Sequence, residues 1–214
     1  MTRQANIEIL STGLKQPVPS SFYVSWIVLT SLCVPIAYLL SIIILKIITN
    51  IVGDYVFVNG IRHITEDYLA MYILVPSVSA LTGLMQYGLL RKYLDHMGWW
   101  ILVTVAGWSL GFLLILLPSW LNWTDAPLSN LDLIFLLMGL GIGTSQWLLL
   151  RHRFTRAGWW VAANIVGWGL LALVTPNNAL GQIGILILGF LPACATAVTL
   201  AFLMNMVAPI EPKM

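Results

Sequence analysis

The sequence is poor in charge, since only 8% of its 214 residues are Asp, Glu, Lys or Arg, whereas a soluble domain carries roughly 25%. So little charge cannot cover the surface of a water-soluble globule. The mean hydropathy of +0.91 excludes a disordered tail, a secreted disulfide scaffold and a nucleic-acid-binding module. Ten basic and eight acidic residues are near balance, which implies no polyanionic partner. The chain is therefore expected to be a multi-pass membrane protein.

Residues that usually carry chemistry are also scarce. The two cysteines, Cys33 and Cys194, lie in apolar runs and are expected to be small buried residues without a disulfide or a metal. The expected membrane spans contain no histidine, which argues against haem or chlorophyll bound through histidine. The sequence has no nucleophile elbow and no zinc motif. It therefore predicts a protein without catalytic residues, metal or cofactor, and we do not expect an enzyme.

Six apolar stretches are long enough to cross a membrane, because about 20 helical residues span a hydrocarbon core of roughly 30 Å. We expect an all-α membrane protein with six transmembrane helices at 22–49, 69–90, 98–117, 131–150, 158–175 and 182–207. Pro118 and Pro176 follow two of these stretches and favour a helix end there. Pro35, Pro76 and Pro192 lie inside stretches and predict kinks.

The chain is expected to form one transmembrane domain at 22–208 between two short tails, 1–21 and 209–214. The first tail lacks the pattern of a secretory signal, so we expect the first helix to remain in the mature protein. Eight of the ten Lys and Arg fall in the tails and in the loops at 91–97 and 151–157. By the positive-inside rule, both termini and these two loops are expected to be cytoplasmic.

Tryptophans collect near the ends of the expected spans, as in the aromatic belts of membrane proteins. We interpret seven of them as anchors at the membrane–water interface: Trp26, Trp99, Trp100, Trp120, Trp123, Trp159 and Trp160. Arg91 and Arg151 lie at the same boundary, where snorkelling and contact with lipid headgroups explain them. A regulatory site for anionic lipid at these arginines is the less favoured alternative.

The most informative feature is a self-similarity at an offset of 60 residues. Eleven residues between Gly83 and Leu110 recur between Gly143 and Leu170, including Gln86 as Gln146. The repeated unit is one helix, a basic turn and a second helix. The sequence therefore predicts a duplicated two-helix hairpin, 69–118 and 131–176, in which the copies share one topology as parallel repeats.

Polar residues inside the two expected hairpins suggest a contact in each. Gln86 and Thr104 lie at comparable depths, as do Gln146 and Asn164, so we predict a hydrogen bond across each hairpin. A path for a polar substrate or ion is the alternative explanation of these four residues.

Small residues spaced four apart predict close helix packing. They are Gly107 and Gly111 in the third span, Gly139 and Gly143 in the fourth, and Gly189, Ala193, Ala197 and Ala201 in the sixth. The sequence does not decide whether the last group packs within the chain or on another subunit.

One charged cluster remains, in the loop after the first span. If this stretch is helical, His63, Glu66 and Asp67 share a face, where a metal site or an acid–base pair can form. A solvated loop is the favoured interpretation. Lys46, near the end of the first span, is expected to snorkel to the same surface, and its pairing with Asp54 or Glu66 is left open.

The repeated Gly-x-x-Gln-[Trp/Tyr]-x-Leu-Leu-Arg motif, followed by Gly-Trp-Trp and Gly-Trp, resembles a pattern of small, uncharacterised multi-pass bacterial membrane proteins. It covers 83–110 and 143–170, about a quarter of the chain. The copies differ at Tyr87, where the second has Trp147. The resemblance implies a bacterial plasma membrane or another energy-transducing membrane, and carries no activity.

Three classes of function are compatible with the sequence. The favoured one is a non-catalytic accessory subunit, whose tryptophan-rich and small-residue faces dock on other membrane-protein subunits, or on their lipids and pigments. The second is a small transporter or channel built on the duplicated hairpin. The third is an intramembrane enzyme that modifies lipid, for which His63, Glu66 and Asp67 are the candidates.

Overall fold

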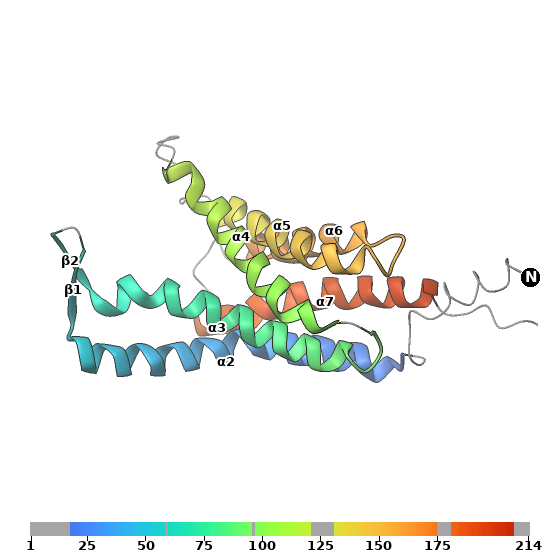
Figure 1. Cartoon of the computed structure of the whole chain (residues 1–214), viewed down its shortest axis with the longest axis horizontal. Coiled ribbons are helices and arrows are strands. Elements are labelled where there is room, and N and C mark those ends of the chain that lie inside the picture. The colour runs from blue at the N-terminus through green and yellow to red at the C-terminus, as the bar shows by residue number, and fades with distance from the viewer. Residues whose placement is uncertain (1–17, 59, 96, 121–130, 175–180, 208–214) are drawn as a thin grey trace, which may run out of the picture.

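The computed structural model describes residues 18–58, 60–95, 97–120, 131–174 and 181–207. These form long helices joined by short connections, with one two-stranded β-hairpin (Figure 1). The helices are α2 (Ser20–Val52), α3 (Thr65–Leu90), α4 (Trp100–Trp120), α5 (Leu131–Leu150), α6 (Gly158–Val174) and α7 (Gly181–Val207). The strands are β1 (Tyr55–Val58) and β2 (Ile61–Ile64), and a short 3-10 turn, Met97–Trp99, precedes α4.

Five helices are long and apolar enough to cross a membrane, so the expectation of a helical membrane protein is confirmed. The candidate spans are Ser20–Val52, Tyr72–Leu90, Met97–Ile115, Leu133–Leu150 and Gly189–Met206. The remaining helix, α6, is 17 residues long. Pro35, Pro76 and Pro192 lie inside α2, α3 and α7. At the end of the third span, α4 continues past Pro118 to Trp120.

The helical fold class agrees with the expectation, and a short β-hairpin stands where a solvated loop was expected after the first helix. β1 and β2 pair antiparallel, with Val58 opposite Ile61, and Gly60 has a φ of +79°. The intervening Asn-Gly dipeptide favours such a tight turn because both of its residues tolerate positive φ. Tyr, Val and Phe make up β1, and Ile begins and ends β2; these residues pack well on a pleated surface. The signal was therefore present in the sequence.

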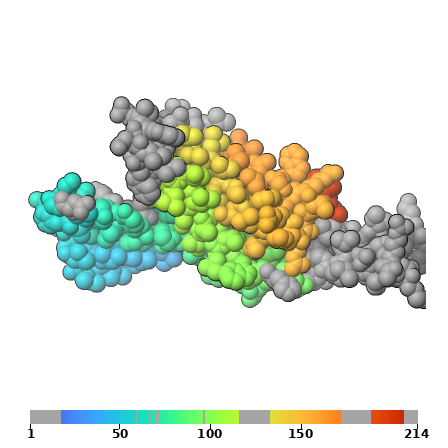
Figure 2. Space-filling model, turned by 45° about the horizontal axis from the view of Figure 1, so that its top comes forward, coloured from blue at the N-terminus to red at the C-terminus, as the bar shows by residue number. Residues whose placement is uncertain are grey.

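The six helices form a closed ring in chain order. α2 packs on α3, each later helix packs on the next, and α7 returns to pack on α2. The chain connections 91–97 and 151–157 lie at one end, which we call the basic end (Figure 1). The β-hairpin lies at the far opposite end (Figure 1, Figure 2).

Small residues let neighbouring helices of the ring approach closely. A Cβ on Gly107 of α4 would lie 2.8 Å from the Cα of Ile142 in α5. A Cβ on Gly139 of α5 would lie 2.6 Å from the backbone oxygen of Asn164 in α6. Three other glycines pack against a neighbouring helix in the same way: Gly111 of α4 against α5, Gly143 of α5 against α6, and Gly189 of α7 against α2. On α7, Ala193 and Ala197 are buried and Ala201 is partly exposed. These faces therefore pack within the chain.

Two apolar clusters fill the ring on either side of its middle. The cluster at the basic end includes Phe22, Leu94, Phe154 and Leu203. The second cluster, towards the β-hairpin, includes Trp108, Ile142 and Trp168. The polar residues described next lie along the inside of the same ring.

Candidate functional site

The same hydrogen bond occurs in both hairpins. The indole Nε1–H of Trp100, at the start of α4, donates to Oε1 of Gln86 in α3 over 3.1 Å. The indole Nε1–H of Trp160, at the start of α6, donates to Oε1 of Gln146 in α5 over 3.0 Å. Each tryptophan is 0% exposed. The two glutamine–tryptophan pairs are thus related by the offset of 60 residues found in the sequence.

The two pairs are joined across the ring by one glutamine. Nε2 of Gln146 donates to Oε1 of Gln86 over 3.2 Å and to Oγ1 of Thr104 over 3.0 Å. Nε2 of Gln86 lies 3.5 Å from Oγ1 of Thr30 in α2. These bonds connect α2, α3, α4 and α5. Each buried bond of this kind stabilises a membrane protein by about 0.6 to 2 kcal/mol.

The structure corrects the partners predicted for the four polar residues. Thr104 donates its hydroxyl to the backbone oxygen of Trp100 over 2.8 Å. Asn164 donates its side-chain amide to the backbone oxygen of Trp160 over 2.9 Å. Each therefore bonds to the preceding turn of its own helix, as polar side chains in helices often do. The glutamine of the same hairpin instead accepts from the tryptophan, whose longer side chain reaches it.

A third buried tryptophan extends this group to the first and last helices. Nε1 of Trp26 in α2 donates to Oγ1 of Thr196 in α7 over 3.1 Å. The Trp26 ring meets the Trp160 ring edge to face, with centroids 6.0 Å apart, and Trp160 meets Trp100 in the same way. We call this group the polar belt: Trp26, Thr30, Gln86, Trp100, Thr104, Gln146, Trp160, Asn164 and Thr196. All six helices contribute to it.

The interpretation of the tryptophans as interfacial anchors is wrong for Trp26, Trp100 and Trp160, because all three side chains are completely buried inside the ring of helices. Trp99 and Trp159 differ, being 65% and 59% exposed. Trp123 and the side chain of Trp120 lie outside the described residues. The sequence offered a signal for Trp100, since it shares a helix face with Thr104 and Gly107. Thr30 and Thr196 carried no comparable signal.

The basic end exposes the two predicted headgroup residues. Arg91 lies over the ring of Tyr87 at 5.9 Å, and Arg151 lies over the ring of Trp147 at 5.3 Å. Both arginines are exposed, as contact with lipid headgroups requires. Arg153 donates to the backbone oxygen of Asp95 over 3.1 Å and so ties the two basic loops together.

A small cavity of about 30 Å³ lies beside the polar belt. Every helix of the ring contributes to its wall, which includes Gln86, Gln146 and Asn164. Among the described residues, the buried polar side chains are Ser, Thr, Gln and Asn, with no charged group. Proton or cation transfer usually uses membrane-embedded carboxylates, so this interior is suited to neutral, hydrogen-bonding species.

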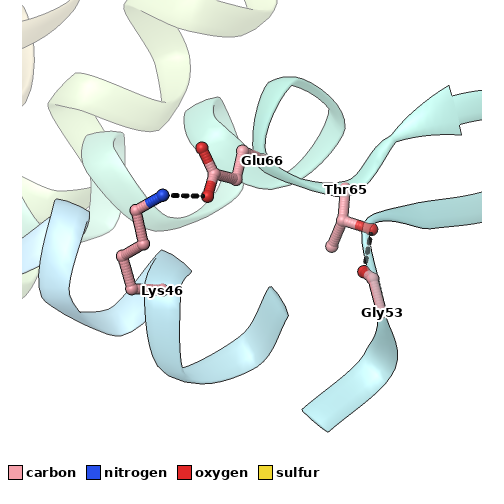
Figure 3. A network of polar contacts seen from close by, with 4 residues as sticks. All are labelled: Lys46, Gly53, Thr65 and Glu66. Carbon is pink, nitrogen blue, oxygen red and sulfur yellow. Dashed lines mark hydrogen bonds and ion pairs between the residues drawn. The ribbon is translucent and has the colours of Figure 1, made fainter. Parts of the chain in front are cut away.

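The opposite end of the molecule has its own polar contacts (Figure 3). Lys46 Nζ donates to Oε1 of Glu66 over 2.8 Å, and both side chains are exposed. The buried Thr65 donates its hydroxyl to the backbone oxygen of Gly53 over 2.7 Å. Of the pairings left open for Lys46, the structure selects Glu66.

The charged cluster expected near His63 is divided between two elements. His63 lies on β2 opposite Val56, and its ring lies 5.2 Å from the Tyr68 ring. Glu66 lies in the first turn of α3, and the side chain of Asp67 lies outside the described residues. No group of three metal-binding side chains occurs in the described part of the chain. Because these residues do not share one helix face, this end gives no support to a lipid-modifying enzyme.

Comparison of the chain with models of known families, with curated proteins and with solved structures gives no significant match.

Proposed function

We propose that this protein is a non-catalytic accessory subunit that docks on another integral membrane protein through the end that carries the β-hairpin. We call this end the apolar tip: the last turns of α2 from Ile47 onwards, with β1 and β2. This surface replaces the small-residue and tryptophan faces suggested by the sequence. The small-residue faces and Trp26, Trp100 and Trp160 pack inside the ring, where a partner cannot reach them. Trp99 and Trp159 stay exposed at the basic end, where they remain free to meet lipid.

The observation that best supports this proposal is the length of α2, which exceeds the thickness of the hydrocarbon core of a bilayer. Its 33 residues make a helix of about 50 Å, at about 1.5 Å per residue. The hydrocarbon core is about 30 Å thick. Even a tilt of about 40°, the upper end of the usual range, leaves about 38 Å along the membrane normal. With the basic end of α2 at the cytoplasmic surface of the membrane, this excess length carries the last turns of α2 and the β-hairpin beyond the hydrocarbon core on the other side.

These outer turns are nevertheless apolar and exposed. Ile51 is 78% exposed and Phe57 is 70% exposed. The rest of the apolar tip exposes Ile47, Val52, Tyr55, Ile61 and Ile64. Lipid covers such side chains inside the bilayer but not beyond it, and exposed apolar patches outside a membrane mark protein contacts. The patch continues the row of exposed isoleucines on the membrane-spanning part of α2, Ile42, Ile43 and Ile44, so a partner that covers it is itself in the membrane.

The proposal includes an orientation and an origin. The basic end faces the cytoplasm of a bacterial plasma or other energy-transducing membrane, with six spans and both termini inside, because the basic loops collect there. The two hairpins arose by duplication, which accounts for the equivalent bonds Trp100–Gln86 and Trp160–Gln146. The relationship to small multi-pass bacterial membrane proteins, suggested by the repeated motif, remains a prediction.

The test compares two single charge insertions at opposite ends of the molecule. Phe57→Lys alters the apolar tip, and Thr155→Lys adds the same charge to an exposed position at the basic end. Each tagged chain is extracted from its native membrane in mild detergent and analysed by native gel and mass spectrometry. We expect the unaltered chain and Thr155→Lys to migrate with one partner protein in fixed stoichiometry, and Phe57→Lys to migrate alone.

Two results contradict the proposal. One is migration of the unaltered chain by itself, as a monomer or homo-oligomer near a multiple of 23.7 kDa. The other is retention of the same partner by Phe57→Lys.

The central cavity supports a second candidate function, a small transporter or channel for a neutral solute. The cavity lies inside a closed ring of helices and has a polar wall. Flux of such a solute into proteoliposomes, abolished by replacing Gln86 and Gln146, would favour this function. The apolar cluster at the basic end fills the interior of the ring between the cavity and that end. A filled interior favours the accessory subunit over a channel.

A further inference from the structure

The cavity beside the polar belt has a wall built by every helix of the ring. Its polar lining residues are Thr30, Thr82, Gln86, Gln146, Asn164 and Thr196. A water molecule needs about 10 to 15 Å³ measured in this way. The cavity, at about 30 Å³, therefore has room for one or two water molecules and for nothing much larger.

The chemistry of the wall distinguishes this cavity from a packing defect. Cavities lined by apolar side chains stay dry, whereas a buried water makes two to four hydrogen bonds to polar partners. Half of the lining residues here are Thr, Gln or Asn. The described wall contains no carboxylate to compensate a cation, and an uncompensated ion is costly at this depth. A neutral molecule fits the wall better than an ion.

The hydrogen-bond capacity of the two glutamines is unequal. Oε1 of Gln86 already accepts from Trp100 and from Gln146. Both amide hydrogens of Gln146 have acceptors, Gln86 and Thr104. By contrast, Nε2 of Gln86 donates within the described residues only to Thr30, over a long 3.5 Å. A primary amide has two hydrogens to donate, so Gln86 keeps donor capacity beside the cavity.

Two further groups on the wall have spare capacity. Oε1 of Gln146 accepts from Trp160, and a carbonyl oxygen has a second lone pair. The indole Nε1–H of Trp108 is buried and has no partner among the described residues. Buried polar groups without a partner are rare, and an ordered water commonly satisfies them.

We propose that this cavity is a hydration site, in which one or two water molecules bridge the amides of Gln86 and Gln146 to the polar residues of α6 and α7. The water completes the polar belt on the side where protein partners are missing. This inference does not depend on the accessory function, because it concerns the interior of the ring and the proposed docking surface is the apolar tip.

The test is the detection of long-lived water at the glutamine side chains by NMR. The protein is labelled with nitrogen-15 in its glutamine side chains and held in lipid nanodiscs. The chain has five glutamines, Gln4, Gln16, Gln86, Gln146 and Gln182, so single substitutions assign the two buried amides. We expect direct Overhauser cross-peaks between long-lived water and the Gln86 amide, with the sign that distinguishes bound water from exchange with bulk solvent.

A cavity-filling variant locates the water. Val34→Ile adds a methyl group to the cavity wall, while Val103→Ile makes the same change on α4 away from that wall. We expect the water cross-peak to fall at least several-fold in Val34→Ile and to persist in Val103→Ile. If Val34→Ile does not fold, Thr30→Val replaces it, because removing this hydroxyl takes away a polar partner in the wall.

Two outcomes overturn the proposal. The first is the absence of a water cross-peak at Gln86 in the unaltered protein, when the amide signal itself is observed. The second is an equal cross-peak in the cavity variant and in Val103→Ile, because the detected water then lies elsewhere.

Discussion

The side-chain amide of Gln146 donates to the side-chain oxygen of Gln86 over 3.2 Å, although the two residues occupy equivalent positions in the two similar hairpins. Two identical side chains can bond in this way only if they take unequal roles. Gln86 accepts twice, and Gln146 donates twice. This asymmetry makes the consequences of substituting the two glutamines different.

Loss of Gln146 is expected to destabilise the protein strongly. Gln146→Leu removes three hydrogen bonds and leaves the Trp160 indole without its acceptor. At about 0.6 to 2 kcal/mol for each bond in a membrane, the free energy of unfolding should fall by about 2 to 6 kcal/mol. The thermal midpoint in detergent measures this change. Leu149→Ala, at a partly buried neighbour, is the control, and a loss in the control equal to that of Gln146→Leu would contradict the prediction.

Adjacent tryptophans are expected to respond differently to the same change. Trp160→Phe removes a buried donor and should lower the free energy of unfolding by about 1 kcal/mol or more. Trp159→Phe alters a side chain that is mostly exposed and should leave the thermal midpoint nearly unchanged. Brominated lipid should quench the fluorescence of Trp159 more than that of Trp160, because Trp159 is accessible to lipid. Stronger lipid quenching of Trp160 than of Trp159 would show that the burial described here is wrong.

Two helical glycines are expected to show opposite effects of a single methyl group. Gly139→Ala places a Cβ 2.6 Å from the backbone oxygen of Asn164, which forces α5 and α6 apart and should cost about 1 to 3 kcal/mol. Gly88→Ala meets nothing within 4 Å and should stabilise α3 by about 0.5 to 1 kcal/mol. Thermal unfolding of both variants in one detergent tests the pair. A stabilising Gly139→Ala would mean that these helices do not pack as described.

The connection between α2 and α3 is expected to depend on Thr65 more than on the nearby ion pair. Thr65→Val removes the hydroxyl that donates to Gly53 from a buried position. Glu66→Gln removes the charge of an exposed pair with Lys46, and exposed pairs contribute little to stability. Hydrogen exchange of residues 53–65 should therefore accelerate in Thr65→Val and stay nearly unchanged in Glu66→Gln. Equal acceleration in both would refute this ranking.

The proposed orientation predicts which end of the molecule is accessible from outside the cell. In a chain with Cys33 and Cys194 replaced by alanine, Asp125→Cys, in the connection between α4 and α5 and outside the apolar tip, should react with a membrane-impermeant maleimide in intact cells. Thr155→Cys should react only after the cells are permeabilised. The reverse pattern would place the basic end outside and contradict the positive-inside rule for this protein.

Most of the helix boundaries followed from the sequence, because length and hydropathy alone decide which segments can cross a bilayer. The predicted span 131–150 coincides with α5, Leu131–Leu150. The β-hairpin was missed even though Asn59-Gly60 is a strong turn signal. It stands in a segment of mixed polar and apolar residues, where the charged side chains suggested a solvated loop.

The polar residues of the site were also found from the sequence, but their partners were not. Gln86, Thr104, Gln146 and Asn164 are unusual in an apolar chain and could be identified by composition alone. Depth along a helix suggested that Gln86 pairs with Thr104. Depth does not give the rotation of each helix or its distance from a neighbour, so it could not show that the Trp100 indole reaches Gln86 first.

The sequence by itself determined a charge-poor chain of apolar helices, the basic turns and the internal similarity at an offset of 60 residues, because these properties are local or additive along the chain. Tertiary structure alone decided that α7 closes the ring on α2, that Trp26, Trp100 and Trp160 face inwards, and that the small residues are used within the chain. Each of these depends on how helices far apart in sequence are rotated and packed together. Packing of that kind is set by the whole set of contacts and not by any one segment.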